Sequence, residues 1–157
     1  MPVVINHWKV APNTAQSLLQ SESYLKSQLA ENGLNPLLVE LVKIRVSQLN
    51  QCAYCLDMHT KDAIAIGETE QRIVGLSAWQ EAPFYSSEER AALAWAEALT
   101  ILGEKAPEPT LRDQLLSNFD EKSLIDLTLA ICTINSWNRV AHAFGTDVGS
   151  YQVGQFG

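Results

Sequence analysis

The sequence has few basic residues and no long apolar run. Its 11 lysines and arginines are outnumbered by 18 acidic residues, which gives a formal net charge of −7. Nucleic acids and anionic membrane surfaces bind basic proteins, so neither is expected as a partner. No apolar stretch approaches the roughly 18–20 residues that cross a bilayer, and the first residues lack the basic region and apolar core of a signal peptide. We therefore expect a cytoplasmic protein.

Cysteine is also scarce. Three cysteines cannot form a framework of paired disulfides, and structural disulfides are rare in the cytoplasm. With 157 residues, 46% of them hydrophobic, the chain is long and apolar enough to bury a core without such staples. This length predicts one domain over residues 1–157. Cys132 stands in an apolar run and is expected to be a small buried residue.

Strand signals are missing as well, because no segment alternates apolar and polar residues over the length of a strand. Helix signals are frequent: Asn35-Pro36 has a capping residue followed by proline, and Ser86 with Glu89 matches a capping box. An all-α domain of about six to seven helices is predicted. The expected helices cover about residues 13–33, 36–49, 52–66, 69–79, 86–102, a short stretch from 110, and 120–144.

The strongest chemical signal is the group Cys52, Cys55 and His59. On an ideal helix these three residues lie within about 60° of one another. Free N–H groups and the helix dipole favour a thiolate near a helix start, and can lower a cysteine pKa from about 8.5 to about 3.5–7.5. A thiolate is the nucleophile, and the neighbouring thiol can close a disulfide on the intermediate. The pattern predicts thiol–disulfide redox chemistry.

Two other interpretations of the cysteine pair remain open. The pair could be half of a zinc site, with His59 and Glu40 as further ligands, but the usual second pair of ligands is missing. The two cysteines could also be inert core residues, since cysteine is often buried. We expect neither a metal nor a cofactor.

The pattern Glu40-x11-Cys52-Ala53-Tyr54-Cys55-x3-His59 resembles the core motif of the alkylhydroperoxidase AhpD-like branch of the carboxymuconolactone decarboxylase superfamily. The stretch 134–140, Ile-Asn-Ser-Trp-Asn-Arg-Val, is similar to a second segment of that superfamily. The two resemblances cover roughly residues 36–67 and 123–145. They imply an AhpD-like all-helical fold over the whole chain and a homo-oligomer, either a trimer or a hexamer.

The resemblance also implies an activity and roles for four residues. The chain would be a peroxidase of the peroxiredoxin type, or a disulfide oxidoreductase, that reduces alkyl hydroperoxides in antioxidant defence. Cys55 would attack the peroxide and Cys52 would resolve the product. Glu40 and His59 would relay protons to activate the thiols. The partners would be a hydroperoxide substrate and a dithiol reductant, such as a lipoyl group on a protein.

Tyr54 departs from the best-studied form of this motif, which has histidine between the cysteines. Tyrosine titrates near 10 and cannot exchange protons at neutral pH as histidine does. This difference leaves the prediction of redox chemistry unchanged and argues against efficient peroxide reduction. Two alternatives are a decarboxylase acting on a lactone ring acid, which needs no cysteine pair, and a non-enzymatic oligomer that responds to oxidation.

Overall fold

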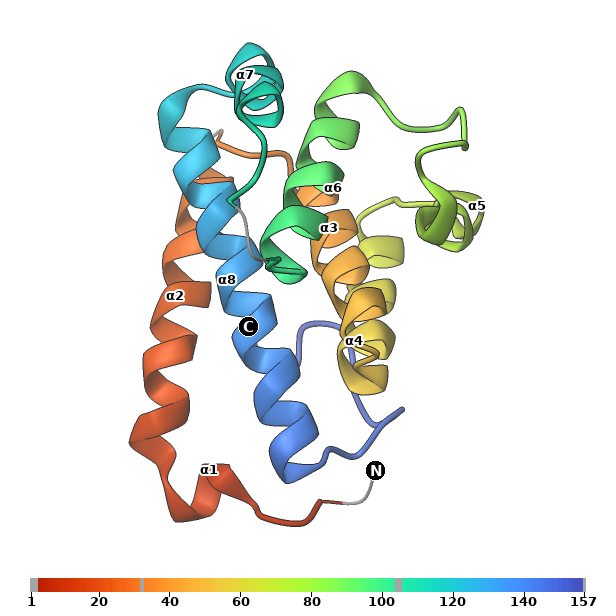
Figure 1. Cartoon of the computed structure of the whole chain (residues 1–157). Coiled ribbons are helices and arrows are strands. Elements are labelled where there is room, and N and C mark those ends of the chain that lie inside the picture. The colour runs from red at the N-terminus through yellow and green to blue at the C-terminus, as the bar shows by residue number, and fades with distance from the viewer. Residues whose placement is uncertain (1–2, 32, 104–105, 157) are drawn as a thin grey trace.

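The computed structural model describes residues 3–31, 33–103 and 106–156. The described residues form eight α-helices and one short 3-10 helix, with no strand among them, which confirms the all-α prediction (Figure 1). The elements are α1 (His7–Val10), α2 (Pro12–Ala30), α3 (Pro36–Leu49), α4 (Ala53–Ala65), α5 (Glu70–Gly75), η1 (Leu76–Ala78), α6 (Ser87–Thr100), α7 (Pro109–Asn118) and α8 (Glu121–Phe144).

Side-chain caps start several helices where the sequence predicted them. The Asn35 side chain accepts the N–H of Leu37 at 2.9 Å, and Pro36 opens α3. Ser86 and Glu89 form both hydrogen bonds of a capping box before α6. The helix expected over about residues 13–33 is α2, which begins one residue earlier, at Pro12, and ends earlier, at Ala30. Its first turn has no side-chain cap hydrogen bond.

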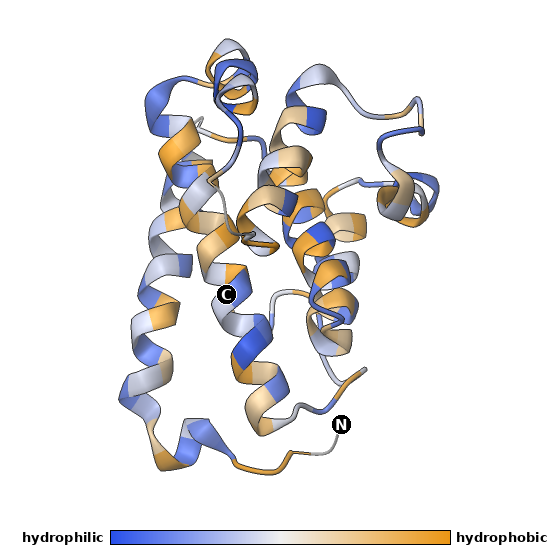
Figure 2. Ribbon diagram, in the orientation of Figure 1, coloured by the Kyte–Doolittle hydropathy of each residue, from blue (hydrophilic) through white to orange (hydrophobic). Residues whose placement is uncertain are grey.

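Helix α3 lies at the centre and packs against α4, α6 and α8 (Figure 1). It is apolar on more than one face because it has neighbours on several sides. Leu41, Val42 and Val46 are therefore fully buried. In Figure 2 α2 and α8 carry both hydrophobic and hydrophilic residues along their length, and both helices contribute residues to the main apolar cluster. This arrangement holds α3 and α4 side by side as the rigid base of the candidate site.

Cys132 is exposed on α8, so the expectation that it is buried was wrong. Its neighbour Ile131 is fully buried, together with Leu127 and Ile134. Successive helical residues differ by about 100° in direction. The residue that follows Ile131 therefore points away from the core face. The apolar sequence around Cys132 did not show which of its residues face solvent.

The chain after α8 is irregular but anchored. It starts at Gly145 and returns along α4, where Tyr151 is only 4% exposed (Figure 1). The Lys61 ammonium on α4 donates a hydrogen bond to the Tyr151 carbonyl oxygen at 3.0 Å. Within the described ranges, none of the helices combines the length and apolar character that a membrane span requires.

Candidate active site

Cys52 and Cys55 lie at the start of α4, after a one-residue turn. Asn50 caps the end of α3, and Gln51 has a φ of 57°, in the left-handed region that turns the chain sharply. Cys52 is the N-cap of α4, and its sulfur accepts the backbone N–H of Cys55 at 3.4 Å. The two sulfurs form a disulfide, with 5.4 Å between the Cα atoms. The local fold thus brings the two cysteines together.

Both cysteines are buried in the main apolar cluster, with 2% of each residue exposed. The cluster joins residues of α2, α3, α6 and α8 around the start of α4. Tyr54, between the cysteines, is half-buried against the same cluster. Burial, followed by the charge of Asp57, raises the pKa of Tyr54, so the phenol keeps its proton at neutral pH. These contacts agree with a packing role for Tyr54.

His59 and Glu40 meet across the contact between α4 and α3. His59 Nδ1 lies 2.8 Å from Glu40 Oε2, and the imidazole is only 4% exposed. An ionised carboxylate only accepts hydrogen bonds, so Nδ1 carries the hydrogen in this contact, and in a neutral imidazole Nε2 is then the acceptor. Nε2 is buried and has no hydrogen-bond partner in the described part of the chain. The contact therefore fixes the orientation of a buried imidazole.

The Glu40 carboxylate is held in its ionised form. Burial alone raises its pKa, but the charge and hydrogen bond of His59, together with Lys43, lower the pKa below its usual range. Lys43 is buried on the same helix and bonds to Glu22 at 2.9 Å. Burial disfavours the charged ammonium, yet Glu22 and Glu40 raise its pKa overall. A fixed negative charge beside His59 stabilises an imidazolium there.

Two residues that the sequence analysis did not single out extend this group. Asp62 lies one turn after His59 on α4, and its two oxygens accept the Tyr151 hydroxyl at 2.7 and 2.9 Å. Burial, followed by the charge of Glu40 among opposing effects, raises the pKa of Asp62. Helical spacing from His59 could have indicated Asp62. Nothing in the sequence indicated Tyr151, which lies 89 residues further along the chain.

Glu40, His59 and Asp62 each offer a ligand atom, and these atoms lie within 4.8 Å of one another. A donor set of two carboxylates and one imidazole could hold a divalent cation. The same atoms already form hydrogen bonds: Glu40 accepts from His59, and Asp62 accepts from Tyr151. The Lys43 charge also acts on both carboxylates. These contacts fit a proton-handling group, and the expectation of no metal stays a prediction.

An amide network fixes the turn before the cysteines to α8. The Asn50 amide donates to Asn135 Oδ1 at 2.9 Å and to Asn138 Oδ1 at 2.8 Å. Asn138 is fully buried and donates to Ser47 at 3.2 Å. The His142 ring adds a contact of 2.7 Å to the Asn50 carbonyl oxygen. The segment 134–140 therefore contributes by holding the end of α3, a role that its sequence did not predict.

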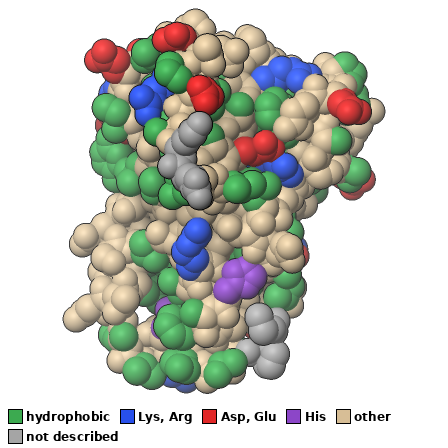
Figure 3. Space-filling view, in the orientation of Figure 1, with side chains coloured by type: hydrophobic (Ala, Val, Ile, Leu, Met, Phe, Trp, Pro, Cys, Tyr) green, Lys and Arg blue, Asp and Glu red, His purple; other side chains and the backbone are tan. Residues whose placement is uncertain are grey.

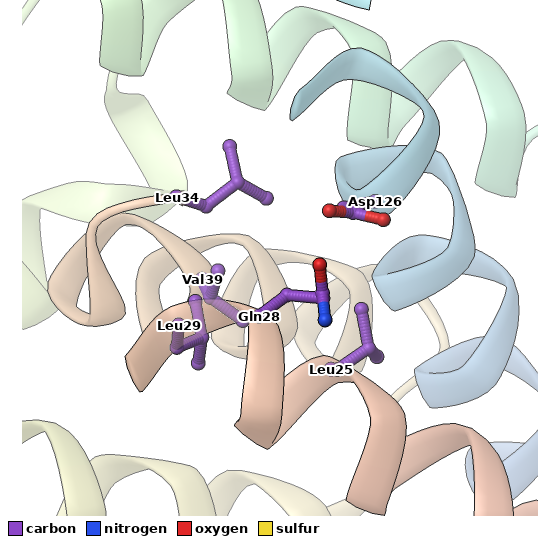
Figure 4. Close-up of a pocket in the computed structure, with 6 residues that line it drawn as sticks. All are labelled: Leu25, Gln28, Leu29, Leu34, Val39 and Asp126. Atoms are coloured by element: carbon purple, nitrogen blue, oxygen red, sulfur yellow. The ribbon is translucent and has the colours of Figure 1, made fainter. Parts of the chain in front are cut away.

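Two hollows lie away from the cysteines. Figure 4 shows a small one between α2, α3 and α8, bordered by Leu25, Gln28, Leu34 and Asp126 among others. A larger open groove of about 480 Å³ lies between α6, α7 and α8, with Trp95 and Ile125 in its wall. Neither is lined by a cysteine or by His59. The candidate site is thus a buried side-chain group that lies outside both of these hollows.

Comparison with known proteins identifies relatives over most of the chain. The sequence pattern of the carboxymuconolactone decarboxylase family matches residues 17–98, a little over half of the chain. The uncharacterized protein YdfG of Bacillus subtilis is 42% identical over 146 residues, which cover 93% of this chain and 97% of YdfG.

Solved structures have the same fold. The protein ATU0492 of Agrobacterium tumefaciens, of unknown function and provisionally described as an AhpD antioxidant defence protein, is 34% identical, with a TM-score of 0.87. That alignment covers 95% of this chain and 99% of ATU0492. An uncharacterized peroxidase-related protein from Silicibacter sp. TM1040 is 26% identical, with a TM-score of 0.74 over 90% of this chain and 73% of its own. The chain therefore belongs to the carboxymuconolactone decarboxylase family, in its AhpD-like branch, as the resemblance of its cysteine motif predicted.

Proposed function

We propose that this protein is a thiol-dependent peroxidase or disulfide oxidoreductase that reduces alkyl hydroperoxides with electrons from a dithiol. One observation carries the proposal: the Cys52–Cys55 disulfide begins the helix that holds His59 against Glu40. This places an oxidisable pair and an oriented base on the same helix. The peroxidase-related and antioxidant descriptions of the structural relatives support the same activity.

In the first step, the Cys55 thiol gives its proton to His59 Nε2, directly or through one water. Glu40 stabilises the imidazolium that forms, because its carboxylate lies 2.8 Å from Nδ1. The Cys55 sulfur then attacks a peroxide oxygen and the O–O bond breaks. The alkoxide leaves as an alcohol with the proton from His59, and Cys55 becomes a sulfenic acid.

In the second step, the Cys52 thiol attacks the Cys55 sulfur. The S–S bond forms, and the sulfenic oxygen leaves as water with the Cys52 proton. A dithiol then reduces the disulfide through two thiol exchanges and is itself oxidised to a disulfide. The net reaction converts a hydroperoxide and a dithiol into an alcohol, water and a disulfide. Since Tyr54 cannot act as a second relay, we expect peroxide turnover to be slow compared with thiol–disulfide exchange.

Peroxide turnover with single cysteine variants tests the proposal. Purified protein is given cumene hydroperoxide and dihydrolipoamide, with Cys132→Ser as the matched control because Cys132 is an exposed thiol outside the site. Cys55→Ser should abolish turnover. Without the dithiol, Cys52→Ser should consume a single equivalent of peroxide and keep a sulfenic acid on Cys55, visible by mass spectrometry. Unchanged turnover in Cys55→Ser would contradict the proposal.

A lactone decarboxylase is the second candidate, and the family to which the chain belongs favours it. That chemistry needs no cysteine pair. A Cys52→Ser/Cys55→Ser double variant that still decarboxylates a carboxymuconolactone at the parent rate would support this function over the redox one. Loss of all dithiol-dependent turnover in that variant, with no decarboxylation by either protein, would exclude it.

We also propose that the chain forms a homo-oligomer. Apolar residues near the amino terminus are exposed, among them Val4 at 74% and Val10 at 75%. In Figure 3 the lower part of the visible face carries few charged side chains, whereas the upper part carries most of them. Apolar, weakly charged surface of this kind is typical of protein interfaces. Native mass spectrometry of the reduced and oxidised protein tests the subunit number and whether it changes on oxidation.

A further inference from the structure

The tail residue Tyr151 is built into the surroundings of the candidate site. It is 4% exposed, and its ring lies 5.9 Å from that of Phe156 in a stacked arrangement. The hydroxyl donates to both oxygens of Asp62, and Lys61 holds the Tyr151 carbonyl. These contacts fix the tail residue at its ring, hydroxyl and backbone. The irregular segment after α8 thus supplies a buried hydroxyl to α4.

Asp62 links that hydroxyl to the proposed proton carriers. A carboxylate oxygen of Asp62, the His59 ring and a Glu40 oxygen lie within 4.8 Å of one another. The charged or titratable groups that act on Asp62 are Glu40 and Lys43 of α3, His59 of α4, and Tyr151 of the tail. At this range, inside a partly buried site, one charge changes the proton affinity of another appreciably.

We propose that Asp62 and Tyr151 are positioning residues of the active site, and that the tail hydroxyl sets how strongly the Asp62 carboxylate favours a protonated His59. The inference rests on the proposed role of His59 as the base for Cys55. Tyr151 shares its hydrogen with the Asp62 oxygens and so weakens their negative field. Asp62 in turn adds a second negative charge beside the one that Glu40 supplies.

The two residues should therefore affect His59 in opposite directions. Asp62→Asn removes a negative charge, so an imidazolium at His59 is less stabilised and the Cys55 thiolate forms at a higher pH. Tyr151→Phe keeps the ring but removes the donor, so the Asp62 charge acts on His59 at greater strength. An imidazolium at His59 is then more stabilised, and the Cys55 thiolate forms at a lower pH. A purely structural role would give losses in the same direction for both variants.

The matched control is Tyr24→Phe. The Tyr24 hydroxyl also donates to an aspartate, Asp126 Oδ1, at 2.9 Å, but this pair joins α2 to α8. The chemical change is thus the same at both tyrosines, a phenol-to-carboxylate hydrogen bond lost with the ring retained. Only the change at Tyr151 should affect the thiols.

The test follows the pH dependence of Cys55 alkylation by iodoacetamide in reduced protein carrying Cys52→Ser and Cys132→Ser. Relative to this parent, Asp62→Asn should move the midpoint up and Tyr151→Phe should move it down, each by about half a pH unit. Tyr24→Phe should leave it unchanged. Shifts of Asp62→Asn and Tyr151→Phe in the same direction, or no shift in either, would overturn the inference.

Alkylation needs no peroxide, so the outcome is separable from the proposed function. Absence of peroxide turnover together with the two opposite shifts would refute the peroxidase activity and support the positioning roles. Peroxide turnover together with an unshifted alkylation midpoint would support the peroxidase activity and refute the positioning roles. Tyr151→Phe retains the buried ring, and Asp62→Asn is a second, independent variant if one of the two proteins folds poorly by circular dichroism.

Discussion

The molecule contains two tyrosine–aspartate pairs whose surroundings differ. Tyr24 donates to Asp126 at 2.9 Å, and Tyr151 donates to Asp62 at 2.7 Å. Asp126 also accepts the Lys122 ammonium at 2.7 Å and borders the small hollow in Figure 4. Asp62 instead shares its surroundings with Glu40 and His59. The tyrosine-to-aspartate hydrogen bond is the same in both pairs. The other groups near the aspartate differ: an ammonium group beside Asp126, and a carboxylate and an imidazole beside Asp62.

This difference teaches how the same two residue types serve different ends. The charge of Asp126 is matched by an ammonium group on the same helix, so the pair can tie α2 to α8 as a structural contact. Asp62 has a second carboxylate and an imidazole nearby, and burial raises its pKa. A second carboxylate and an imidazole beside Asp62 form a group of titratable residues that can influence one another, whereas Asp126 accepts hydrogen bonds from a phenol and an ammonium group.

The largest effect is expected from Glu40→Gln, which removes the carboxylate that most distinguishes the Asp62 group. The glutamine keeps the size of the side chain but cannot stabilise a charged His59. We expect the rate of Cys55 alkylation or peroxide reaction at pH 7 to fall by about 10–100-fold. Lys122→Gln, the matched loss of a charged partner in the Asp126 group, should leave the rate unchanged. A rate in Glu40→Gln within about twofold of the parent would contradict the role of Glu40.

The second prediction compares how much each aspartate of the two tyrosine–aspartate pairs contributes to the free energy of unfolding. Asp126 is 2% exposed and holds two partners, so Asp126→Ala should lower the free energy of unfolding by about 1–3 kcal/mol. Asp62 is half-buried, and Asp62→Ala should lower the same quantity by less. Urea unfolding of the oxidised proteins measures both. A larger loss in Asp62→Ala would show that the Asp62 group is chiefly structural.

Short-range signals in the sequence predicted much of the fold. Asn35-Pro36 and the Ser86–Glu89 box started helices as expected, because a cap involves residues only two or three positions apart. The spacing of Cys52 and Cys55 likewise placed the pair within one turn at the start of α4. Each of these features is fixed by local geometry, which a single sequence contains.

Contacts between distant segments could not be predicted in this way. Asp62 and Tyr151 are 89 positions apart, and Asn50 and Asn138 are 88 apart. No periodicity relates such residues, because the path of the chain between them decides whether they meet. The contact of Glu40 with His59 joins α3 to α4, and its role was implied by the family resemblance. The outward direction of Cys132 also depends on which face of α8 is covered by its neighbours.

The third prediction uses pH to compare Asp62 with Glu40. The pKa of Asp62 is raised in the folded protein, so its contribution to stability is lost as pH rises from the ordinary aspartate range through the raised pKa. The pKa of Glu40 is lowered, so its contribution is present above its ordinary pKa and is lost as pH falls through the lowered one. Ionisation of Asp62 and of Glu40 therefore has opposite effects on the free energy of unfolding as pH rises.

Unfolding in urea at pH 4 and pH 7 tests this opposition. Relative to the parent, Asp62→Asn should be more stable at pH 7 than at pH 4. Glu40→Gln should be less stable at pH 7 than at pH 4, again relative to the parent. If both variants change the pH dependence of the free energy of unfolding in the same direction, the pKa values of Asp62 and Glu40 are not shifted in opposite directions.

The smallest effect is expected at Cys132, which shares α8 with Asp126 but is exposed. Cys132→Ser should change the free energy of unfolding by no more than about 0.5 kcal/mol, because no buried contact is lost. Thiol titration with Ellman's reagent gives the matching chemical result. The oxidised parent should show a single reactive thiol and the oxidised variant none, since the disulfide joins the other two cysteines. A reactive thiol left in the oxidised variant would mean that the Cys52–Cys55 disulfide opens without a reductant. The stabilities of the Asp62 and Asp126 variants would then have to be compared on fully reduced protein.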